Sequence, residues 1–230
     1  MKIDVLDKGY VRMVHAYGSD VDVSNAARVS YDKESTELTE GDMKLIAFLA
    51  REDHTSPFRH VGINFEVYAP LMIARQWWKY VVGSDHTMDA WNESSRRYVT
   101  ETPTFYIPKN DEWRSQPENS KQGSGEPVDA EREGAWLTSD LVHYVNEGVR
   151  LYEKAMERGA CAEQARLFLP SYGMYVRWRW VGSLQSIAHL VNQRTAKDSQ
   201  FEFQQYAKAV RDIAKQAFPY SMTHLTEVNK

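Results

Sequence analysis

The stretch Ile63-Asn64-Phe65-Glu66-Val67-Tyr68-Ala69-Pro70 decides how the fold is organised around its centre. Its apolar and polar residues alternate strictly, which predicts a β-strand with one buried face. Ala69-Pro70 ends that strand, and helical spacing follows over residues 71–81, with Pro70 near the first turn. The predicted helix carries Arg75, Gln76 and Lys79, and positions 75 and 79 share one face.

Outward from this centre, strands and helices mix without a regular βαβ period. Residues 1–17 predict one or two short strands, and apolar residues at 174, 176, 178 and 180 alternate with Tyr175, Arg177 and Arg179 in a strand with one basic face. The pattern predicts an α+β fold, with an antiparallel or mixed β-sheet core flanked by helices. Further helices are predicted after a capping box at 39–42 and over residues 139–158, 162–169, 184–194 and 198–218.

A length of 230 residues favours a single domain, and we predict that residues 1–230 form one catalytic domain. Hydrophobic residues make up 42% of the chain, which is enough for a substantial core. Residues 109–134 contain two prolines, three glycines, many charges and little apolar content. This composition predicts a mobile surface loop.

The bulk charge and hydropathy exclude some partners. A formal net charge of −4 argues against a nucleic-acid polymer as partner, because proteins that coat nucleic acids usually carry a basic excess. A small anionic ligand needs only local arginines. No apolar run is long enough for a transmembrane helix, and residues 1–7 lack the apolar core of a signal peptide, so no membrane association is expected. The single cysteine excludes an internal disulfide and fits a reducing, cytoplasmic location.

Neither the cysteine nor the histidines predict a metal site or a covalent nucleophile. Cys161 stands at a predicted helix start, where the helix dipole could activate it, but we interpret it as a small packing residue. His54 and His60 do not have metal-ligand spacing, and no metal is expected. Phosphate-binding glycine loops and a Gly-x-Ser-x-Gly elbow are also missing from the sequence.

A cluster of polar residues points to a small-molecule site instead. Residues 75–80 and the segment Asn92-Glu93-Ser94-Ser95-Arg96-Arg97-Tyr98 together hold arginines, amides, hydroxyls and a carboxylate. Arginine beside serine suits a phosphate, and amides suit the edge of a planar base. Trp77, Trp78 and Trp91 can exclude water from such a site. The alternative is a solvated, charged helix face.

Five segments resemble, in order from residue 1 to about residue 215, the flavin-dependent thymidylate synthases. They are residues 1–9, Ala27-Arg28-Val29-Ser30-Tyr31, Ala74-Arg75-Gln76-Trp77, residues 92–98, and Gln200-Phe201-Glu202-Phe203-Gln204-Gln205-Tyr206. The family signature is Arg-His-Arg, seven residues, then serine. Its downstream half, Asn-Glu-x-Ser-x-Arg-Tyr, is intact here and includes Ser95, Arg97 and Tyr98.

The upstream half of the signature departs from the family. Lys79-Tyr80-Val81 stands where Arg-His-Arg is expected, and 13 residues (82–94) instead of seven precede Ser95, six more than usual. The additional residues fall within 83–90, a segment that we predict to be a flexible flap replacing lost flavin contacts, with a plain loop insertion as the alternative. The chain is therefore identified as a diverged member of the family.

The resemblance implies a reaction and its nucleotide site. The family methylates dUMP to dTMP, with methylenetetrahydrofolate as carbon donor and reduced FAD, recharged by NADPH, as hydride source; it needs no cysteine nucleophile. Arg194 matches the family's activating arginine and is the implied catalytic residue. The dUMP-binding residues implied by the resemblance are Gln76, Lys79, Glu93, Ser94, Ser95, Arg96, Arg97, Arg166 and Arg194.

The resemblance also implies a flavin site and an oligomer. In the family the sites form between subunits of a homotetramer, so Arg166 is expected to serve a neighbour's nucleotide. The implied FAD-binding residues are His54, Ser56, Lys79, Tyr80, Val81, Asn92, Glu93, Ser183, Gln185 and His189. The last three are the weaker matches, since the family commonly has Asn and Arg near them.

Three other interpretations remain open at the level of sequence. The altered 79–81 segment allows a flavin- and folate-dependent nucleotide modifier with another product, such as a hydroxymethylated one. A catalytically silent nucleotide- or flavin-binding homologue is the second, although Arg194, Arg166 and Glu93 argue against it. The third is an α+β domain with a charged surface and no ligand.

Overall fold

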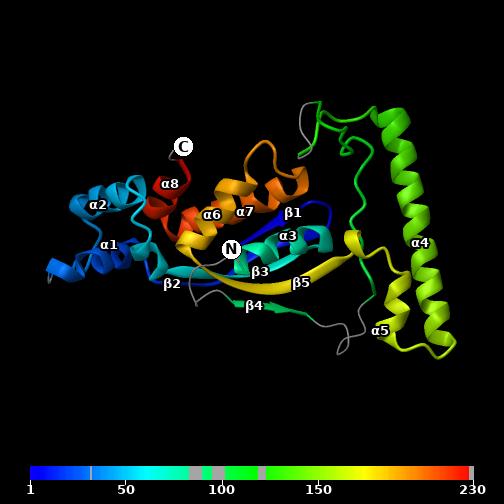
Figure 1. Ribbon diagram of the computed structural model, residues 1–230, viewed down its shortest axis with the longest axis horizontal. Helices are drawn as coiled ribbons and strands as arrows, with labels where there is room; N and C mark the ends of the chain where they lie inside the picture. Colours follow the sequence, from blue (N-terminus) through cyan, green and yellow to red (C-terminus); the bar gives the residue numbers. More distant parts are fainter. Residues whose placement is uncertain (32, 83–89, 95–101, 119–122, 228–230) are drawn as a thin grey trace.

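The protein is built on one five-stranded sheet, seen in a computed structural model that describes residues 1–31, 33–82, 90–94, 102–118 and 123–227 (Figure 1). The strands are β1 (Lys2–Val5), β2 (Gly9–Tyr17), β3 (Gly62–Pro70), β4 (Ala90–Glu93) and β5 (Tyr175–Ser183). Their order is β1-β2-β3-β5-β4, and every neighbouring pair is antiparallel. The predicted α+β class is confirmed, and the sheet is antiparallel rather than mixed.

The strand that the sequence marked first lies at the centre of the sheet. β3 pairs with β2 on one side and with β5 along its whole length on the other. Its apolar residues Ile63, Phe65 and Val67 are fully buried, while Asn64 and Glu66 face the opposite side, as alternation requires. On that opposite face Glu66 forms ion pairs with Arg12 and Arg179.

Three helices cover the apolar face of the sheet: α3 (Leu71–Val82), α6 (Leu184–Arg194) and α7 (Phe201–Ala217) (Figure 1). Trp77 of α3 packs against Trp178 and Trp180 of β5 and Phe203 of α7 at ring separations of 5.4–5.6 Å. This aromatic cluster joins sheet and helices into one core. It also fixes α3 and the start of α7 relative to β5.

The remaining helices lie at the two ends of the sheet (Figure 1). α1 (Asp20–Arg28), α2 (Glu40–Arg51) and α8 (Pro219–Glu227) pack together at one end. At the other end α4 (Ala135–Glu157) stands upright with α5 (Ala162–Ala165) and the 3-10 turn η4 (Arg166–Phe168). We call this second group, residues 135–168, the arm.

Several element boundaries differ from the sequence predictions. The helix predicted over 162–169 is only the four residues of α5, followed by η4, because Pro170 stops it and the turn tightens. Pro219 ends α7 as predicted but also starts α8, a helix not predicted, since proline is well suited to a first helical turn. α1 and β4 were missed too, because neither has clear apolar periodicity in the sequence.

Among its described residues, the predicted loop of residues 109–134 contains no strand and only the five-residue π-helix Ala130–Gly134. Hydrogen bonds hold parts of this segment in place. Trp113 donates its indole N–H to Thr138 at 2.8 Å, and Ser115 and Glu126 share a backbone hydrogen bond of 2.9 Å. Residues 119–122 lie outside the described part, and the mobility of the segment stays a prediction.

Candidate functional site

The ends of α3, α6 and α7 bring together the residue predicted to be catalytic and its neighbours. Arg194 stands in the last turn of α6, after the buried Leu190 and Val191. Its guanidinium carbon lies 5.4 Å from the centre of the Tyr80 ring and 5.1 Å from that of Phe203, in cation–π geometry. Its Nε is buried and has no hydrogen-bond acceptor among the described residues. An acceptor on a bound ligand would satisfy this donor.

Tyr80 is the middle residue of the altered 79–81 segment, and it is buried against α6. The side chain is 8% exposed and its hydroxyl donates to Gln193 Oε1 at 3.3 Å. The His189 ring lies edge-on to it, with 5.6 Å between ring centres. Burial raises the pKa of Tyr80 above its ordinary value, while the charge of Arg194 and its hydrogen bond oppose that rise. The hydroxyl therefore stays protonated near neutral pH and supports the α6 end rather than acting as a base.

Gln76 belongs to the same group of helix ends, one turn before Tyr80. Its Nε2 donates to Gln200 Oε1 at 2.5 Å, and the Gln200 amide donates to Glu202 Oε2 at 2.9 Å. Lys79 is exposed on the same helix and makes no ion pair with the described residues. The predicted base-reading amide is thus held by the start of α7, and the predicted cation is exposed on α3.

The short strand β4 supplies the acidic group. Because successive strand residues face opposite sides, Asn92 lies opposite Arg179 on the polar face and Glu93 lies on the helix side. The Glu93 residue is exposed as a whole, but neighbouring atoms partly desolvate its carboxyl and raise its pKa, and a hydrogen bond from the Trp91 indole opposes the rise. The exposed Ser94 extends the strand, since its backbone N–H donates to Arg177 O at 2.8 Å.

Two of the segments that carry predicted flavin residues, 54–56 and 183–189, meet through a hydrogen bond. His54 and Ser56 are exposed around the 3-10 turn η2 (Ser56–Arg59). Arg59 of that turn donates to Gln185 of α6 at 2.5 Å. Ser183 is less available, because it is fully buried and its hydroxyl caps α6 by accepting from the backbone N–H of Ser186. His54, Ser56 and His189 are by contrast exposed, and Gln185 is half-buried.

Arg166 is not brought to this group within the chain. It begins η4 on the arm, and the arm stands at the far end of the sheet from α6 (Figure 1). Its Nε donates to Ala162 O at 3.3 Å. Cys161 precedes it as the N-terminal boundary of α5 and is exposed, so its interpretation as a packing residue is wrong.

Some predicted residues cannot be placed. Ser95, Arg96 and Arg97 lie outside the described residues, as do positions 83–89 of the predicted flap and the side chain of Val81. Within the described ranges, no group of three or more His, Cys, Asp or Glu side chains could hold a metal ion, and no helix is long and apolar enough to cross a membrane.

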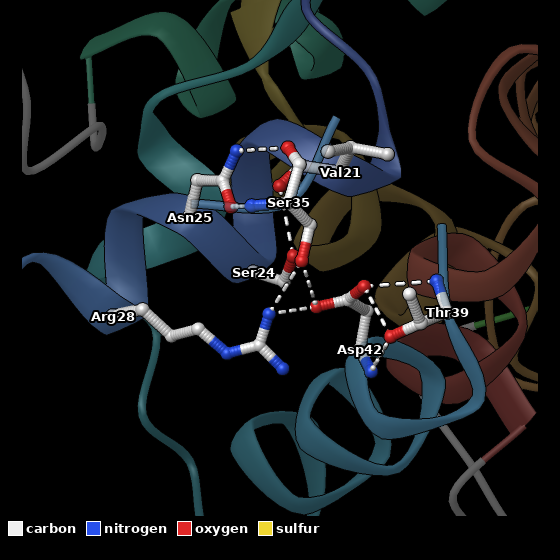
Figure 2. A network of polar contacts seen from close by, with 7 residues as sticks. All are labelled: Val21, Ser24, Asn25, Arg28, Ser35, Thr39 and Asp42. Atoms are coloured by element: carbon white, nitrogen blue, oxygen red, sulfur yellow. Dashed lines mark hydrogen bonds and ion pairs between the residues drawn. The ribbon is translucent and has the colours of Figure 1, made fainter. Parts of the chain in front are cut away.

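A second arginine, in α1, stands in a different setting (Figure 2). Arg28, in the last turn of α1, forms an ion pair with the fully buried Asp42 of α2 and donates to Ser35 Oγ at 2.9 Å. Thr39 caps α2 and bonds the same carboxylate through its backbone N–H and hydroxyl, at 2.8 and 2.6 Å. Burial alone would raise the pKa of Asp42, but the hydrogen bonds from Thr39, Ser24 and Ser35 hold it well below its ordinary value.

The geometry of the site indicates which class of ligand it can bind. Helix ends on one face of an antiparallel sheet present an unmatched arginine donor, an amide pair and aromatic rings, and such a set suits a planar, anionic or strongly accepting small molecule.

The comparisons identify the family within that class. The family described as thymidylate synthase complementing protein matches residues 12–220. A flavin-dependent thymidylate synthase of Thermotoga neapolitana is 34% identical, covering 96% of this chain and 92% of its own. One from Thermus thermophilus is 35% identical, covering 99% and 79%. The chain belongs to this family of methyltransferases, the flavin-dependent thymidylate synthases.

A solved structure confirms the fold. The crystal structure of a UMP/dUMP methylase, PolB from Streptomyces cacaoi, bound with 5-Br UMP, superposes with a TM-score of 0.81 at 22% identity, over 98% of this chain and 96% of its own.

Sequence reasoning missed four residues that shape the site: Arg59, Gln193, Gln200 and Phe203. Gln200 and Phe203 stand in a segment that carried the family resemblance, so that signal was available. Arg59 and Gln193 have no signal in the sequence, because their contacts at Gln185 and Tyr80 join segments more than 100 positions apart.

Proposed function

We propose that this protein methylates dUMP to dTMP, with methylenetetrahydrofolate as carbon donor and NADPH-reduced FAD as hydride source. The observation that carries the proposal is the Arg194 guanidinium, held against two aromatic rings with its buried Nε unmatched. Membership of the family supports the reaction. The enzyme would work in the cytoplasm, a reducing setting that the single cysteine fits.

Arg194 would act on the pyrimidine. Negative charge develops on the ring oxygens and N3 when uracil becomes nucleophilic at carbon 5, and a fixed guanidinium stabilises that charge without reorganising. Tyr80 and Phe203 hold the guanidinium in place and exclude water, which strengthens the interaction. No protein nucleophile is needed in this proposal.

The other residues would bind the nucleotide. Gln76, positioned by Gln200, would contact the nucleotide beside Arg194, with Lys79 adding positive charge from its exposed position on α3. Glu93 would contact a donor of the ligand, because its partly desolvated carboxyl has acceptor capacity on the helix side of β4. Ser94, Ser95, Arg96 and Arg97 would bind the phosphate, with Arg166 completing that site.

The flavin would lie between η2 and α6. His54, Ser56, Gln185 and His189 are exposed or half-buried there, and the bond between Arg59 and Gln185 holds the two segments together. The bound flavin supplies the hydride chemistry, and the protein supplies position and electrostatics. The resemblance adds Lys79, Tyr80, Val81, Asn92 and Glu93 to the flavin site. Of these, Tyr80 packs on His189, whereas Asn92 lies on the opposite, polar face of the sheet.

The active assembly would be a homotetramer with shared sites. The arm exposes large apolar side chains that a monomer would bury poorly: Trp136 is 61% exposed, Tyr144 60% and Leu167 85%. Arg166 begins η4 on this arm, and the arm stands apart from α6, whose last residue is Arg194 (Figure 1). A neighbouring subunit that covers the arm would receive Arg166 beside its own nucleotide.

The experiment is turnover with product identification. The purified protein should show flavin absorbance that bleaches with NADPH, and dUMP with methylenetetrahydrofolate should then yield dTMP by mass spectrometry. A hydroxymethylated nucleotide would establish the alternative product, which the altered 79–81 segment motivates. A flavin-loaded, folded protein that leaves dUMP unchanged would refute catalysis on this substrate.

A further inference from the structure

The side-chain amides of Gln76 and Gln200 form a chain of hydrogen bonds that ends on a carboxylate. Gln76, on α3, donates through its Nε2 to Gln200 Oε1 at 2.5 Å and to the main-chain oxygen of Met72 at 3.3 Å. Gln200, just before α7, donates through its Nε2 to Glu202 Oε2 at 2.9 Å and to Met72 Sδ at 3.5 Å. An amide nitrogen carries two N–H groups, so each Nε2 has as many acceptors as it has hydrogens.

The acceptors in this chain fix the orientation of both amides. An amide can be turned over, with its oxygen and nitrogen exchanged, only when its partners can both donate and accept. The carboxylate of Glu202, the thioether of Met72 and the Met72 carbonyl have no hydrogen to donate. Turning Gln200 over would place its oxygen against the carboxylate, and turning Gln76 over would place its oxygen against the Met72 carbonyl. Glu202 therefore sets the orientation of Gln200, and Gln200 sets that of Gln76.

The start of α7 favours this arrangement. Glu202 lies in the first turn, where a carboxylate complements the positive end of the helix dipole. Gln200 occupies the N-cap position, where Ser, Thr, Asp and Asn are the usual capping residues, yet its side chain makes no capping hydrogen bond. That side chain contacts α3 instead, 124 positions away in the sequence, so it serves Gln76 rather than its own helix.

The chain of hydrogen bonds leaves Gln76 Oε1 for a ligand. No donor of the described residues reaches this oxygen, and solvent does, since it is not one of the buried atoms that lack a partner. A carbonyl oxygen accepts but cannot donate, so it repels a phosphate, whose oxygens also only accept. The donors that dUMP offers are the N3–H of the uracil ring and the 3′-hydroxyl of the sugar.

We propose that Gln200 and Glu202 are positioning residues, which make Gln76 a hydrogen-bond acceptor toward the base or sugar of the nucleotide and not a donor to its phosphate. This role rests on the proposed function, because it takes dUMP as the ligand. It adds the polarity of the Gln76 contact and the two residues that set that polarity. Both act through Gln76 and need not touch the nucleotide.

Two replacements of Gln76 test the polarity of the contact, by calorimetric titration of dUMP into the flavin-loaded protein. Gln76→Met removes the acceptor at similar length and should raise the dissociation constant roughly tenfold. Gln76→Glu keeps an oxygen acceptor and should bind dUMP more tightly than Gln76→Met. If Gln76 donated to the phosphate, a carboxylate would repel that phosphate and Gln76→Glu would bind more weakly than Gln76→Met. That reversed order, or wild-type affinity in Gln76→Met, would overturn the proposal.

A double-mutant cycle tests the positioning role. Glu202→Gln replaces the carboxylate by an amide that can face either way, and should raise the dissociation constant about two- to fivefold, because it rises as the correctly oriented fraction of Gln76 falls. In the Gln76→Met background the same change should have no effect, since no amide is left to orient. Glu40→Gln, exposed in the first turn of α2, is the matched control and should keep wild-type affinity. A Glu202→Gln effect that persists without Gln76, or none in the wild type, would contradict positioning.

The same titrations identify the donor and separate this role from the proposed function. With 2′,3′-dideoxyuridine 5′-monophosphate, the penalty of Gln76→Met should disappear if the 3′-hydroxyl is the donor and persist if N3–H is. Wild-type protein that does not bind dUMP would refute the proposed function and this role with it. Wild-type binding with the reversed order of the two Gln76 variants would refute the positioning alone.

Discussion

Arg28 and Arg194 each occupy the last turn of a helix on this sheet, yet their surroundings are opposite. Arg28 meets a buried carboxylate and a serine hydroxyl in a network where a threonine also bonds the carboxylate (Figure 2). Arg194 meets two aromatic rings, and its Nε has no acceptor in the described chain. A cation with its partners in place stabilises the fold, whereas one that lacks an acceptor is ready for a ligand. The difference separates a structural arginine from a functional one, although the two look alike in the sequence.

Replacing Arg194 should give the largest effect on catalysis. Arg194→Ala should lower kcat/KM for dUMP by about 10²–10³-fold, equivalent to about 3–4 kcal/mol of transition-state stabilisation. The free energy of unfolding should change by only about 1 kcal/mol, the scale of a lost cation–π contact. Steady-state kinetics and urea unfolding on the same preparation measure both. Wild-type turnover in the variant would contradict the role of Arg194.

Replacing Asp42 should have the opposite effect, a large loss of stability with little change in catalysis. Asp42→Ala removes one partner of a buried pair and leaves Arg28 unmatched, which should reduce the free energy of unfolding by about 3 kcal/mol, the low end for buried pairs because Arg28 is 22% exposed. Denaturant unfolding with and without dUMP measures it. The folded fraction should retain near-normal kcat, and a variant that unfolds like the wild type would remove Asp42 from the structural side of the comparison.

The dependence of stability on acidic pH provides a further test of the role of Asp42. The pKa of Asp42 is lowered in the folded state, so its contribution is complete above its ordinary value of 3.8 and is lost as the pH falls below that value. Asp42→Asn should therefore have a flatter stability profile than the wild type below about pH 4. Chemical unfolding at a series of pH values shows this, and parallel profiles would mean that Asp42 is not the group that titrates.

A third arginine, Arg166, fits neither setting within one chain and should have an intermediate effect. Arg166→Ala should raise KM for dUMP more than it lowers kcat, by a loss of about 1.5–3 kcal/mol, because a phosphate contact holds equally in the ground and transition states. Mixing Arg166→Ala with Arg194→Ala protomers should restore some activity if Arg166 serves a neighbour. If subunit exchange is proven and the mixed oligomers recover no activity, both arginines belong to the site of one subunit.

Cys161 should give the smallest effect. Cys161→Ala should leave kcat, KM and the melting temperature nearly unchanged, because the thiol is exposed on the arm and no covalent attack is proposed. A folded but inactive Cys161→Ala protein would indicate a cysteine mechanism. Thiol alkylation of the wild-type enzyme, which should be harmless, provides an independent check.

The central fold could be predicted because its signals are local. Alternation over 63–68, Pro70 at the strand-to-helix change and the apolar stripe of α4 each depend on near neighbours. β4 and α1 were missed since short, polar elements form only when a neighbour is present, and β4 pairs with β5, some 90 positions away. The end of α7 at Pro219 was correct, but the start of α8 at the same proline was not, because one residue fits both.

The candidate site also has one part that could be predicted from sequence motifs and another that only the tertiary structure shows. Gln76, Glu93, Ser94 and Arg194 were named from motifs, since residue type and spacing carry the chemistry of a phosphate and a base. Tertiary structure alone pairs Gln76 with Gln200 and Tyr80 with Gln193, and leaves Ser183 buried as a helix cap. It also separates Arg166 from Arg194 within one chain, which the order of the motifs does not show.

The sequence by itself determined the α+β class, the central strand and helix, the family and the identity of most candidate residues. Local periodicity sets secondary structure, and the residue types set the available chemistry. Only the tertiary structure decided which arginine is matched by Asp42, which one keeps a buried Nε without an acceptor among the described residues, and that Cys161 is exposed. Those outcomes depend on burial and on partners far apart in the chain, and neither is encoded in the spacing of neighbouring residues.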